Sequence, residues 1–221
     1  MAEKIIQADK SDIFTDLVEY TKLPRPLVLE RCNYAVVELA VQWYRRKDNL
    51  DFYRNNELYL FDLTKYQMVL ESQKAITNMI IQLKELGINK VLEFGGGIGE
   101  FSLLCDRNRI KSSYYDLDGK IKDYAVWRFR RHKSNIIILD EKSDALSDKW
   151  DTVNIMDVLE HIEDPNKILE KLAKNVKYIF CNPEQMLYTI IYPQHISKYD
   201  PAMFGFEKVE GFLWKNTKLV V

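Results

Sequence analysis

Two acidic residues and two histidines in the second half of the chain are the side chains best suited to acid–base chemistry. Asp157, Glu160 and His161 directly follow a short apolar run, and His195 lies further along the chain. Imidazole and carboxyl groups exchange protons readily with a bound substrate. We therefore take His161 as the first candidate for a general base, His195 as the second, and Glu160 as a partner that orients the imidazole. In the alternative interpretation Asp157 only caps a helix and the histidines pack.

A second pattern is the run Glu93-x-Gly95-x-Gly97-x-Gly99, which joins an apolar segment to residues at helical spacing. It predicts a strand, a tight turn and the start of a helix. Such a turn leaves backbone N–H groups beside a helix N-terminus, where a polar or anionic ligand can dock. A dinucleotide-binding fingerprint needs a third glycine at position 100, which is Glu100. The pattern therefore argues against NAD as the ligand.

The acid-x-Gly-x-Gly-x-Gly pattern resembles the first motif of the class I S-adenosylmethionine (SAM) dependent methyltransferases, and the resemblance extends over roughly residues 70–221. In that family the glycine turn packs against the methionine part of SAM, and the acid engages its amino group. The resemblance thus implies SAM as the cofactor, with Glu93, Gly95, Gly97 and Gly99 around it. The alternative is a turn whose glycines serve packing only.

Residues 157–161, with the sequence Asp-Val-Leu-Glu-His, resemble the strand-end segment of small-molecule methyltransferases such as the ubiquinone-biosynthesis O-methyltransferases. Ligands of open α/β sheets bind outside the carboxyl ends of the strands. We therefore expect this segment to face the reaction centre, with Met156 and Asp157 beside the cofactor.

A divalent metal ion is an alternative to a free base in this segment. If a helix begins at residue 157, the side chains at 157, 160 and 161 share one face of it. Together with His195 they would form a mixed oxygen and nitrogen set that suits Mg²⁺, Mn²⁺ or Zn²⁺. Methyltransferases that resemble this segment and carry a later histidine are in part metal-dependent, and this resemblance is the main reason to consider a metal. Our primary interpretation assigns none.

The candidate for the ribose of the cofactor is an acid after the next predicted strand, Ser112–Tyr115. Asp116 lies 21 residues past Gly95, where a doubly wound fold places a carboxylate for ribose hydroxyls. A carboxylate suits this role because it accepts two hydrogen bonds from a vicinal diol. We favour Asp116, with Leu117 beside it. Asp118 is the competing candidate, and a simple Asx-Gly turn is the alternative for both.

A third strand, fully buried, is expected over Ile136–Leu139, because apolar residues without alternation suit a sheet covered on both faces. The resemblance implies that Asp140, at the end of this strand, reads the adenine amino group. Glu141 and Asp144 are close competitors for that role. The basic segment Arg128–His132, which precedes the strand, is expected to form a solvated helix face.

The chain divides into an expected N-terminal helical cap, residues 1–66, and a Rossmann-like SAM-binding domain, residues 67–221. Ser11 is expected to cap the first helix. The segment Leu23–Pro26 should end that helix, because its two prolines lack the backbone donors that a continuing helix needs. A further helix is expected around residues 68–86.

The stretch from Leu50 to Tyr66 is rich in aromatic residues, and we expect most of them to pack the cap onto the rest of the protein. Tyr59 and Tyr66 are the candidates for contact with a substrate. In the family that the chain resembles, N-terminal additions commonly cover the acceptor site. Tyrosine suits such a site because its ring has an apolar face and a polar tip.

The C-terminal part completes the expected sheet. Tyr178–Cys181 reads as the fifth strand, and Glu207–Trp214 with Thr217–Val221 as a hairpin turned at Lys215–Asn216. A terminal antiparallel hairpin on a parallel sheet is what the resemblance implies. The expected fold is therefore an α/β, Rossmann-like class I methyltransferase sheet with a terminal antiparallel hairpin and an N-terminal helical cap.

Composition limits the partners and the location. The net charge of -1 gives no general attraction to nucleic acid or to an anionic membrane. No apolar run approaches the length of about 18 residues that a membrane span needs, and the charged N-terminus lacks an apolar signal segment. Cys32, Cys105 and Cys181 are odd in number and widely spaced. They indicate reduced core cysteines and a cytoplasmic protein.

The resemblance implies SAM-dependent methylation of an oxygen or carbon atom in a small molecule, in a biosynthetic reaction. This chemistry requires the protein to align the donor and the acceptor, to exclude water and to supply one proton acceptor. Two other classes stay open. The first is a metal-dependent RNA 2′-O-methyltransferase, because residues 157–161, followed by Asn182-Pro183-Glu184 and His195, loosely resemble the small-RNA terminal enzymes. The second is a non-catalytic SAM-binding protein, since fold alone does not establish function.

Overall fold

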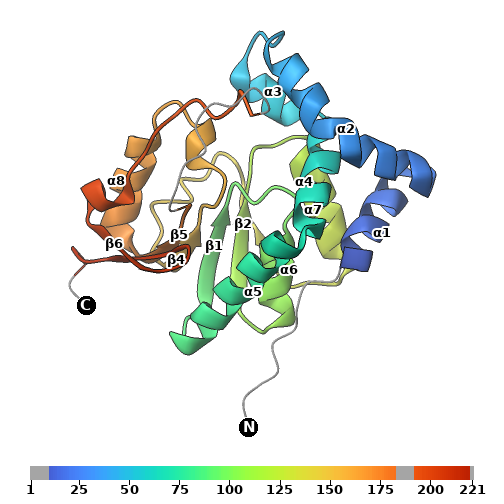
Figure 1. The fold of residues 1–221 in the computed structure, drawn as a ribbon. Helices are drawn as coiled ribbons and strands as arrows, with labels where there is room; N and C mark the ends of the chain where they lie inside the picture. Colours follow the sequence, from blue (N-terminus) through green and yellow to red (C-terminus); the bar gives the residue numbers. More distant parts are fainter. Residues whose placement is uncertain (1–9, 183–191, 220–221) are drawn as a thin grey trace.

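A seven-stranded sheet runs through the molecule (Figure 1), and the computed structural model describes it within residues 10–182 and 192–219. Its order is β3-β2-β1-β4-β5-β7-β6, and β1 pairs in parallel with both β2 and β4. The last strand, β7, is antiparallel to β5 and β6. The predicted α/β sheet with a terminal antiparallel hairpin is thus confirmed. The strands are β1 Lys90–Phe94, β2 Lys111–Tyr115, β3 Ile137–Ile138, β4 Trp150–Asn154, β5 Val176–Phe180, β6 Phe206–Glu210 and β7 Leu213–Asn216.

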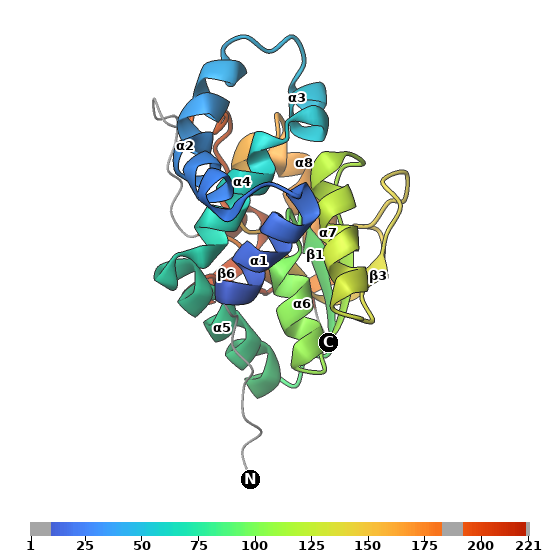
Figure 2. The same ribbon diagram turned by 90° about the vertical axis from the view of Figure 1, so that its right-hand side faces the viewer.

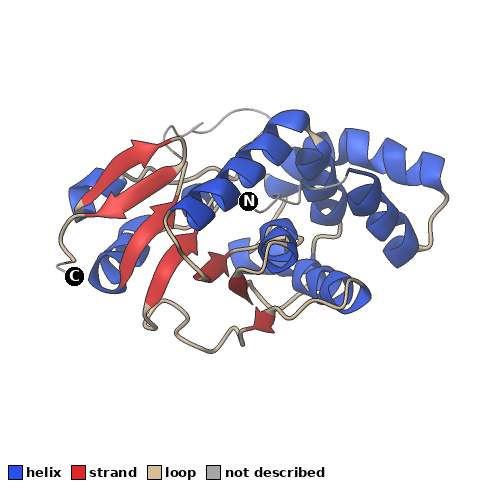
Figure 3. Ribbon diagram, turned by 90° about the horizontal axis from the view of Figure 1, so that it is seen from below, coloured by secondary structure: helices blue, strands red, loops and turns tan. Residues whose placement is uncertain are grey.

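Helices cover both faces of the sheet, outside the central row of strands (Figure 3). On one face α5 and α6 pack against β1, and their side chains form one apolar cluster with Val91, Phe180 and Leu213. On the other face α8 packs against Leu92 and Val153. The helices of this part are α5 Leu70–Glu85, α6 Glu100–Arg107, α7 Lys120–Arg131 and α8 Pro165–Asn175, with the 3-10 turns η1 Leu159–His161 and η2 Pro201–Phe204.

Strand β3 differs from its prediction as a fully buried strand. It pairs only with β2 at the edge of the sheet, and the side chains of Ile137 and Ile138 are 60% and 41% exposed. An edge strand has a neighbour on one side only, so apolar composition does not guarantee cover. The prediction of a buried strand was wrong for this reason.

The C-terminal hairpin turns earlier than predicted. Its turn lies at Gly211–Phe212, where Gly211 has a φ of +56°. The predicted turn residues Lys215 and Asn216 are instead part of β7. Asn216 is held there because its side-chain amide donates to the carbonyls of Ala173 and Val176, each at 2.9 Å. The predicted turn position was therefore wrong, although the hairpin itself is confirmed.

Four of the described helices lie ahead of α5 in the chain and gather on one side of the molecule, beside α6 and α7 (Figure 2). α2 begins directly after Pro24 with Pro26 in its first turn, which confirms the predicted break. Ser11 lies inside α1 and not ahead of it. The predicted boundary at residues 66 and 67 falls inside the last of these helices. They are α1 Lys10–Thr21, α2 Arg25–Trp43, α3 Asn49–Asn55 and α4 Leu58–Met68.

The basic end of α7 is only in part the solvated face that the sequence predicts, because Arg130 and Arg131 are exposed but Arg128 is not. The side chain of Arg128 is fully buried and pairs with Asp16 of α1 and Glu100 of α6. Arg131 and His132 also contact Asp16, at 2.8 Å each. The prediction was wrong for Arg128, because its partner Asp16 lies 112 residues earlier in the chain, where local charge patterns give no sign of the pairing.

Cys32, Cys105 and Cys181 are buried and free, as predicted. Among the helices within residues 10–182 and 192–219, none has the length and apolar character that crossing a membrane requires.

Replacing Gly99 with alanine is expected to destabilise the fold more than the same change at Gly87. Both glycines have positive φ, +73° and +64°, so alanine costs about 1–2 kcal/mol at each. At Gly99 the added Cβ would also lie 2.4 Å from the ring of Phe129, whereas at Gly87 it would meet nothing within 4 Å. Urea denaturation should therefore show an additional loss of about 1–3 kcal/mol for Gly99→Ala. Equal losses in the two variants would contradict the packing argument.

Candidate active site

One large cavity lies at the carboxyl ends of β1, β2 and β4, with α2, α3 and α4 contributing its opposite wall. Its volume is about 1400 Å³. Pockets for a single drug-sized ligand usually hold about 300–1,000 Å³. The cavity therefore has room for a cofactor and a second small molecule.

Most of the residues predicted to form the site line this cavity. They are Tyr59, Tyr66, Glu93, Gly95, Gly97, Asp116, Leu117, Met156, Asp157, His161 and His195.

Three predicted site residues are not part of its lining, within the described part of the chain. Gly99 packs against Phe129 at the start of α6. The carboxylate of Asp140 is exposed and accepts a hydrogen bond from the Lys142 N–H. Glu160 is buried beside His161, and it is described with the histidines below.

The glycine turn has the expected backbone but not the expected free donors. Gly95, Gly97 and Gly99 have φ values of +68°, +53° and +73°, which favour glycine. The N–H groups of Gly95 and Gly96 both donate to the carbonyl of Tyr115, at 2.8 and 3.2 Å. The turn thus presents closely packed backbone to the cavity, but two of its N–H groups already donate to β2.

Glu93 lies at the inner end of the cavity and is 4% exposed. Its Oε2 accepts hydrogen bonds from the backbone N–H and the hydroxyl of Ser102. Burial raises the pKa of Glu93 to about 8. A cationic group that enters this end of the cavity would therefore stabilise the ionised form of Glu93 and lower its pKa.

Asp116 and Asp118 have different surroundings. Asp116 lines the cavity, and its two oxygens accept hydrogen bonds from the N–H groups of Leu117 and Gly97, both at 2.7 Å. Burial raises its pKa to about 6. The side chain of Asp118 is 60% exposed and pairs with Lys122 at 2.7 Å. The hydroxyl of Tyr114 also lies 3.5 Å from Oδ2 of Asp116, so Oδ1 is the oxygen with a further lone pair for a ligand.

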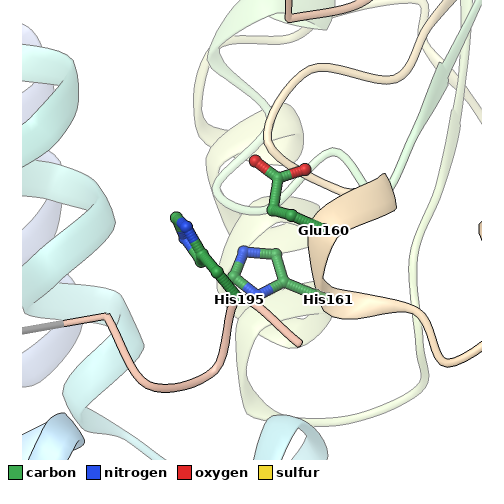
Figure 4. A group of neighbouring side chains, drawn as sticks. All are labelled: Glu160, His161 and His195. Atoms are coloured by element: carbon green, nitrogen blue, oxygen red, sulfur yellow. The ribbon is translucent and has the colours of Figure 1, made fainter. Parts of the chain in front are cut away.

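His161 and His195 are brought together by backbone hydrogen bonds. The carbonyl of Glu160 accepts from the N–H groups of Ile196 and Ser197, at 2.8 and 3.1 Å. This holds the segment after residue 191 against η1, and the two imidazole rings lie 4.8 Å apart at an angle of 79°. Figure 4 shows Glu160 and His161 on one turn and His195 arriving from the other segment. The two histidines predicted to act together therefore lie side by side.

The hydrogen bonding of His161 defines which nitrogen is available. Its Nδ1 lies 3.2 Å from the carbonyl oxygen of Gln194, which can only accept, so Nδ1 carries the proton. The hydroxyl of Tyr53 lies 3.2 Å from the same nitrogen. Burial, with a smaller effect from His195, lowers the pKa of His161 to about 3. The ring is therefore neutral at physiological pH, with the lone pair on Nε2.

Glu160 completes a cluster with the two histidines. Its side chain is 4% exposed, and its Oε2 has no hydrogen-bond partner among the described residues. Burial, assisted by the charge of Asp157, raises the pKa of Glu160 to about 7. One ligand atom from each of Glu160, His161 and His195 lies within 4.8 Å of the others. A carboxylate with two imidazoles can take up a proton or hold a divalent cation.

Asp157 does not join this cluster. The helical turn begins only at Leu159, and Asp157 has a φ of +55° ahead of it. Its carboxylate accepts a hydrogen bond from the Asn182 side chain at 2.6 Å. The predicted common helix face of residues 157, 160 and 161 was wrong, because the chain makes a left-handed turn where a helix was expected.

The two predicted substrate tyrosines both face the cavity but differ in exposure. Tyr59 is 6% exposed and packs against Phe52 and Tyr53, with ring centroids 5.9 and 5.6 Å away. Tyr66 is 45% exposed. Tyr59 thus supports the wall of the cavity, whereas the ring of Tyr66 is accessible to a ligand.

Three site residues were not predicted. Tyr53 contacts His161, Asn182 contacts Asp157, and Leu63 approaches Gly97, where an added Cβ would lie 3.1 Å from its Cδ1. Asn182 follows β5 at the sheet edge where Asp116 and Asp157 follow β2 and β4, so its position was a usable signal. Tyr53 belongs to the aromatic stretch and had no distinguishing feature there. Leu63 had no local signal.

Comparison with known proteins agrees with this geometry. A family model described as a methyltransferase domain matches residues 46–188, well over half of the 221-residue chain. No curated protein matches the chain.

Among solved structures, magnesium protoporphyrin IX methyltransferase from Synechocystis PCC 6803 with bound SAM is 17% identical, with a TM-score of 0.50, and the match covers 70% of this chain and 76% of that chain. The same enzyme with bound S-adenosylhomocysteine (SAH) is 18% identical, with a TM-score of 0.47 and coverage of 57% and 62%. The methyltransferase domain of bacterial CtHen1-C is also 18% identical, with a TM-score of 0.41 and coverage of 48% and 62%. These last two matches thus span less than two thirds of the other chains.

The family match rests on sequence, and the strand order β3-β2-β1-β4-β5-β7-β6 rests on the structure. Both observations lead to the same assignment. The chain belongs to the methyltransferase domain family and is a class I, SAM-dependent methyltransferase.

Proposed function

We propose that this methyltransferase transfers the methyl group of SAM to an oxygen or carbon atom of a small molecule in a biosynthetic reaction. The observation that carries the proposal is that one cavity of about 1400 Å³ is lined by both groups of candidate residues. One part of its wall holds buried carboxyls beside the glycine turn, and another holds the histidine pair beneath the helices α2–α4. A donor and an acceptor would therefore share one enclosed space, which favours their alignment and excludes water.

The residues around the glycine turn fit SAM. Glu93 would accept the ammonium group of the cofactor, and Asp116 would accept hydrogen bonds from the ribose hydroxyls. Gly97 supports this assignment, because it lines the cavity and a side chain there would meet Leu63 of α4. When bound, SAM supplies an activated methyl group on a positively charged sulfur. Leu117, Met156 and Asp157 complete the proposed cofactor contacts. Gly99 does not line the cavity, and it packs against Phe129 instead.

The histidine cluster is the proposed proton acceptor. The Nε2 lone pair of His161 is available, and His161 and His195 both line the cavity. Glu160 has a pKa near the working range of a base, and it adjoins both rings. We assign His161 and His195 to contact with the acceptor, and Glu160 to receiving or stabilising the proton. Tyr66, and Tyr59 behind it, would form part of the acceptor wall.

A second proposal is that Glu160, His161 and His195 hold a divalent cation. The unpartnered Oε2 of the buried Glu160 favours it, because a buried carboxylate oxygen without a partner is costly. The Nδ1–H of His161 points to a carbonyl, as it does in many metal-binding histidines. A bound cation would lower the pKa of an acceptor hydroxyl.

Location and partners follow from the same features. Three buried free cysteines support a cytoplasmic location. The net charge of -1 supports a small-molecule partner in preference to nucleic acid.

Wild-type protein is expected to bind SAM and SAH but not NAD, and to methylate members of a panel of small hydroxylated or carbon-acid acceptors. A ligand at 100 times its dissociation constant adds about 2.7 kcal/mol of stability, which thermal shift detects.

Gly97→Val should abolish SAM binding while the protein stays folded, because valine fits poorly at positive φ beside Leu63. Turnover of RNA alone, with a salt-dependent gel shift, would instead support the RNA alternative. SAM binding without turnover of any acceptor would support the non-catalytic alternative.

The affinity for SAM should rise with pH between about 6 and 8. Free Glu93 has a pKa of about 8, so it is mostly protonated below that pH and must lose its proton to pair with an ammonium group. Affinity should therefore increase by up to about tenfold per pH unit and level off near pH 8, where the ligand amine begins to deprotonate. Calorimetric titration at several pH values measures the slope. Glu93→Gln should bind SAM more weakly at pH 8 and show no slope, and an unchanged slope in that variant would exclude Glu93 as the titrating group.

If a cation is held by the cluster, methyl transfer should fall at least about tenfold in EDTA and return with Mn²⁺ or Mg²⁺. His195→Ala should remove this response, because one ligand of three is lost. Asn182→Ala is the matched control, since Asn182 adjoins Glu160 without belonging to the cluster, and its activity should keep the metal response. Mn²⁺ binding can also be followed directly by electron paramagnetic resonance without substrate. Full activity in EDTA with no bound Mn²⁺ would leave the proton-acceptor proposal and exclude the metal.

A further inference from the structure

Arg128 connects three separate parts of the protein through one buried guanidinium. Its Nε donates to Asp16 of α1 at 2.9 Å, and its Nη2 donates to Glu100, the first residue of α6, at 2.6 Å. Its Nη1 donates to the carbonyl of Ile98 in the glycine turn at 2.7 Å. Arg128 and its two carboxylate partners are each at most 2% exposed. The arrangement joins a helix of the N-terminal layer to the turn that lines the cavity.

The ion pairs of Arg128 are an expensive way to obtain stability alone. Removing charges from water costs several kcal/mol for each ion, and apolar residues of similar volume are often equally stable in such places. Their geometry, however, fixes directions. A guanidinium offers donors in a rigid planar fork, so three acceptors in one plane determine where each of them lies. The placement of the Ile98 carbonyl is therefore tied to the placement of Asp16.

The peptide that Arg128 holds belongs to the most restricted part of the turn. Ile98 lies between Gly97 and Gly99, both with positive φ. From the cavity side the Gly97 N–H donates to Asp116 at 2.7 Å. From the opposite side Arg128 takes the Ile98 carbonyl. The turn is thus held on two sides, and a change at Arg128 alters the backbone on which the proposed cofactor residues depend.

We propose that Asp16 is a positioning residue for the cofactor site, acting through Arg128 on the glycine turn, so that SAM binding and the docking of α1 are coupled. The inference rests on the proposed binding of SAM at this turn. Asp16 does not line the cavity, and it lies outside residues 46–188, which match the family model. Because coupling between two sites is reciprocal, bound SAM must also hold α1 more firmly in place.

The test compares Asp16→Asn with Asp12→Asn. Asn keeps the shape of Asp16 but removes its charge, and Arg128 still keeps Glu100 as a partner. Asp12 also lies on α1 and forms an exposed ion pair with Arg107 of α6 at 3.6 Å. Asp12→Asn therefore removes a contact between α1 and α6 that does not involve Arg128. The dissociation constant of SAM, measured by calorimetry where circular dichroism shows both variants folded, should rise about fivefold or more in Asp16→Asn. It should change less than about twofold in Asp12→Asn.

Two further measurements separate positioning from a structural role. With an acceptor from the panel, Asp16→Asn should raise the KM for SAM and leave the KM for the acceptor unchanged. A lower melting temperature with unchanged SAM affinity would show a structural role and overturn the inference. Arg128→Lys, which keeps the charge but loses the planar fork, should weaken SAM in the same way as Asp16→Asn.

Hydrogen exchange on the wild-type protein decides the question even if both variants fail to fold. SAH should slow amide exchange in α1, residues 10–21, as well as at the glycine turn. Protection confined to the turn would overturn the coupling while SAM binding and the proposed function remain. Absence of SAM binding by the wild-type protein would overturn the proposed function and, with it, the inference.

Discussion

The parallel pairing of β1 with β2 on one side and β4 on the other is the constraint on which the site depends. In this arrangement three strands run in the same direction, and their carboxyl ends meet at one edge of the sheet. Gly95 and Gly96 follow β1 and donate to the last carbonyl of β2, that of Tyr115. Asp116 follows β2, and Met156 follows β4. Residues from distant parts of the sequence thus reach one cavity because each comes directly after a strand.

The electrostatic character of the cavity follows from burial at this edge. Carboxyl groups near this edge lie below the surface of the covered sheet, and their pKa values rise because water no longer stabilises the charged form. Glu93, Asp116 and Glu160 all show this rise. His161 shows the opposite shift for the same reason, since burial disfavours its cationic form. At neutral pH, Glu93 and His161 are therefore mainly uncharged, and a ligand of suitable charge or proton affinity would change those forms on entry.

Local backbone requirements allowed part of the fold and of the candidate site to be predicted from the sequence. Glycines at alternate positions predicted the turn after β1, and proline predicted the start of α2, because both residues restrict or extend φ in known ways. An acid directly after a strand was sufficient to place Asp116 in the cavity. The outcomes that failed depend on neighbours far away in the sequence: the edge position of β3, the register of the C-terminal hairpin and the burial of Arg128. The helix predicted at Asp157 was wrong for a different reason. Aspartate adopts positive φ more often than most residues, but its presence does not predict that conformation.

The pairing of Asp16 with Arg128 also affects the order in which the chain can fold. The two residues are 112 positions apart, so α1 leaves the ribosome long before its polar anchor in α7 exists. Until α7 is made, the apolar side chains of Ile13 and Leu17, which are fully buried in the finished protein, have only part of their cover. Contacts of such large sequence separation form late, because a long loop must close first. The N-terminal helices therefore keep part of their apolar surface uncovered during synthesis until α7 has been made, and such exposed surface favours aggregation.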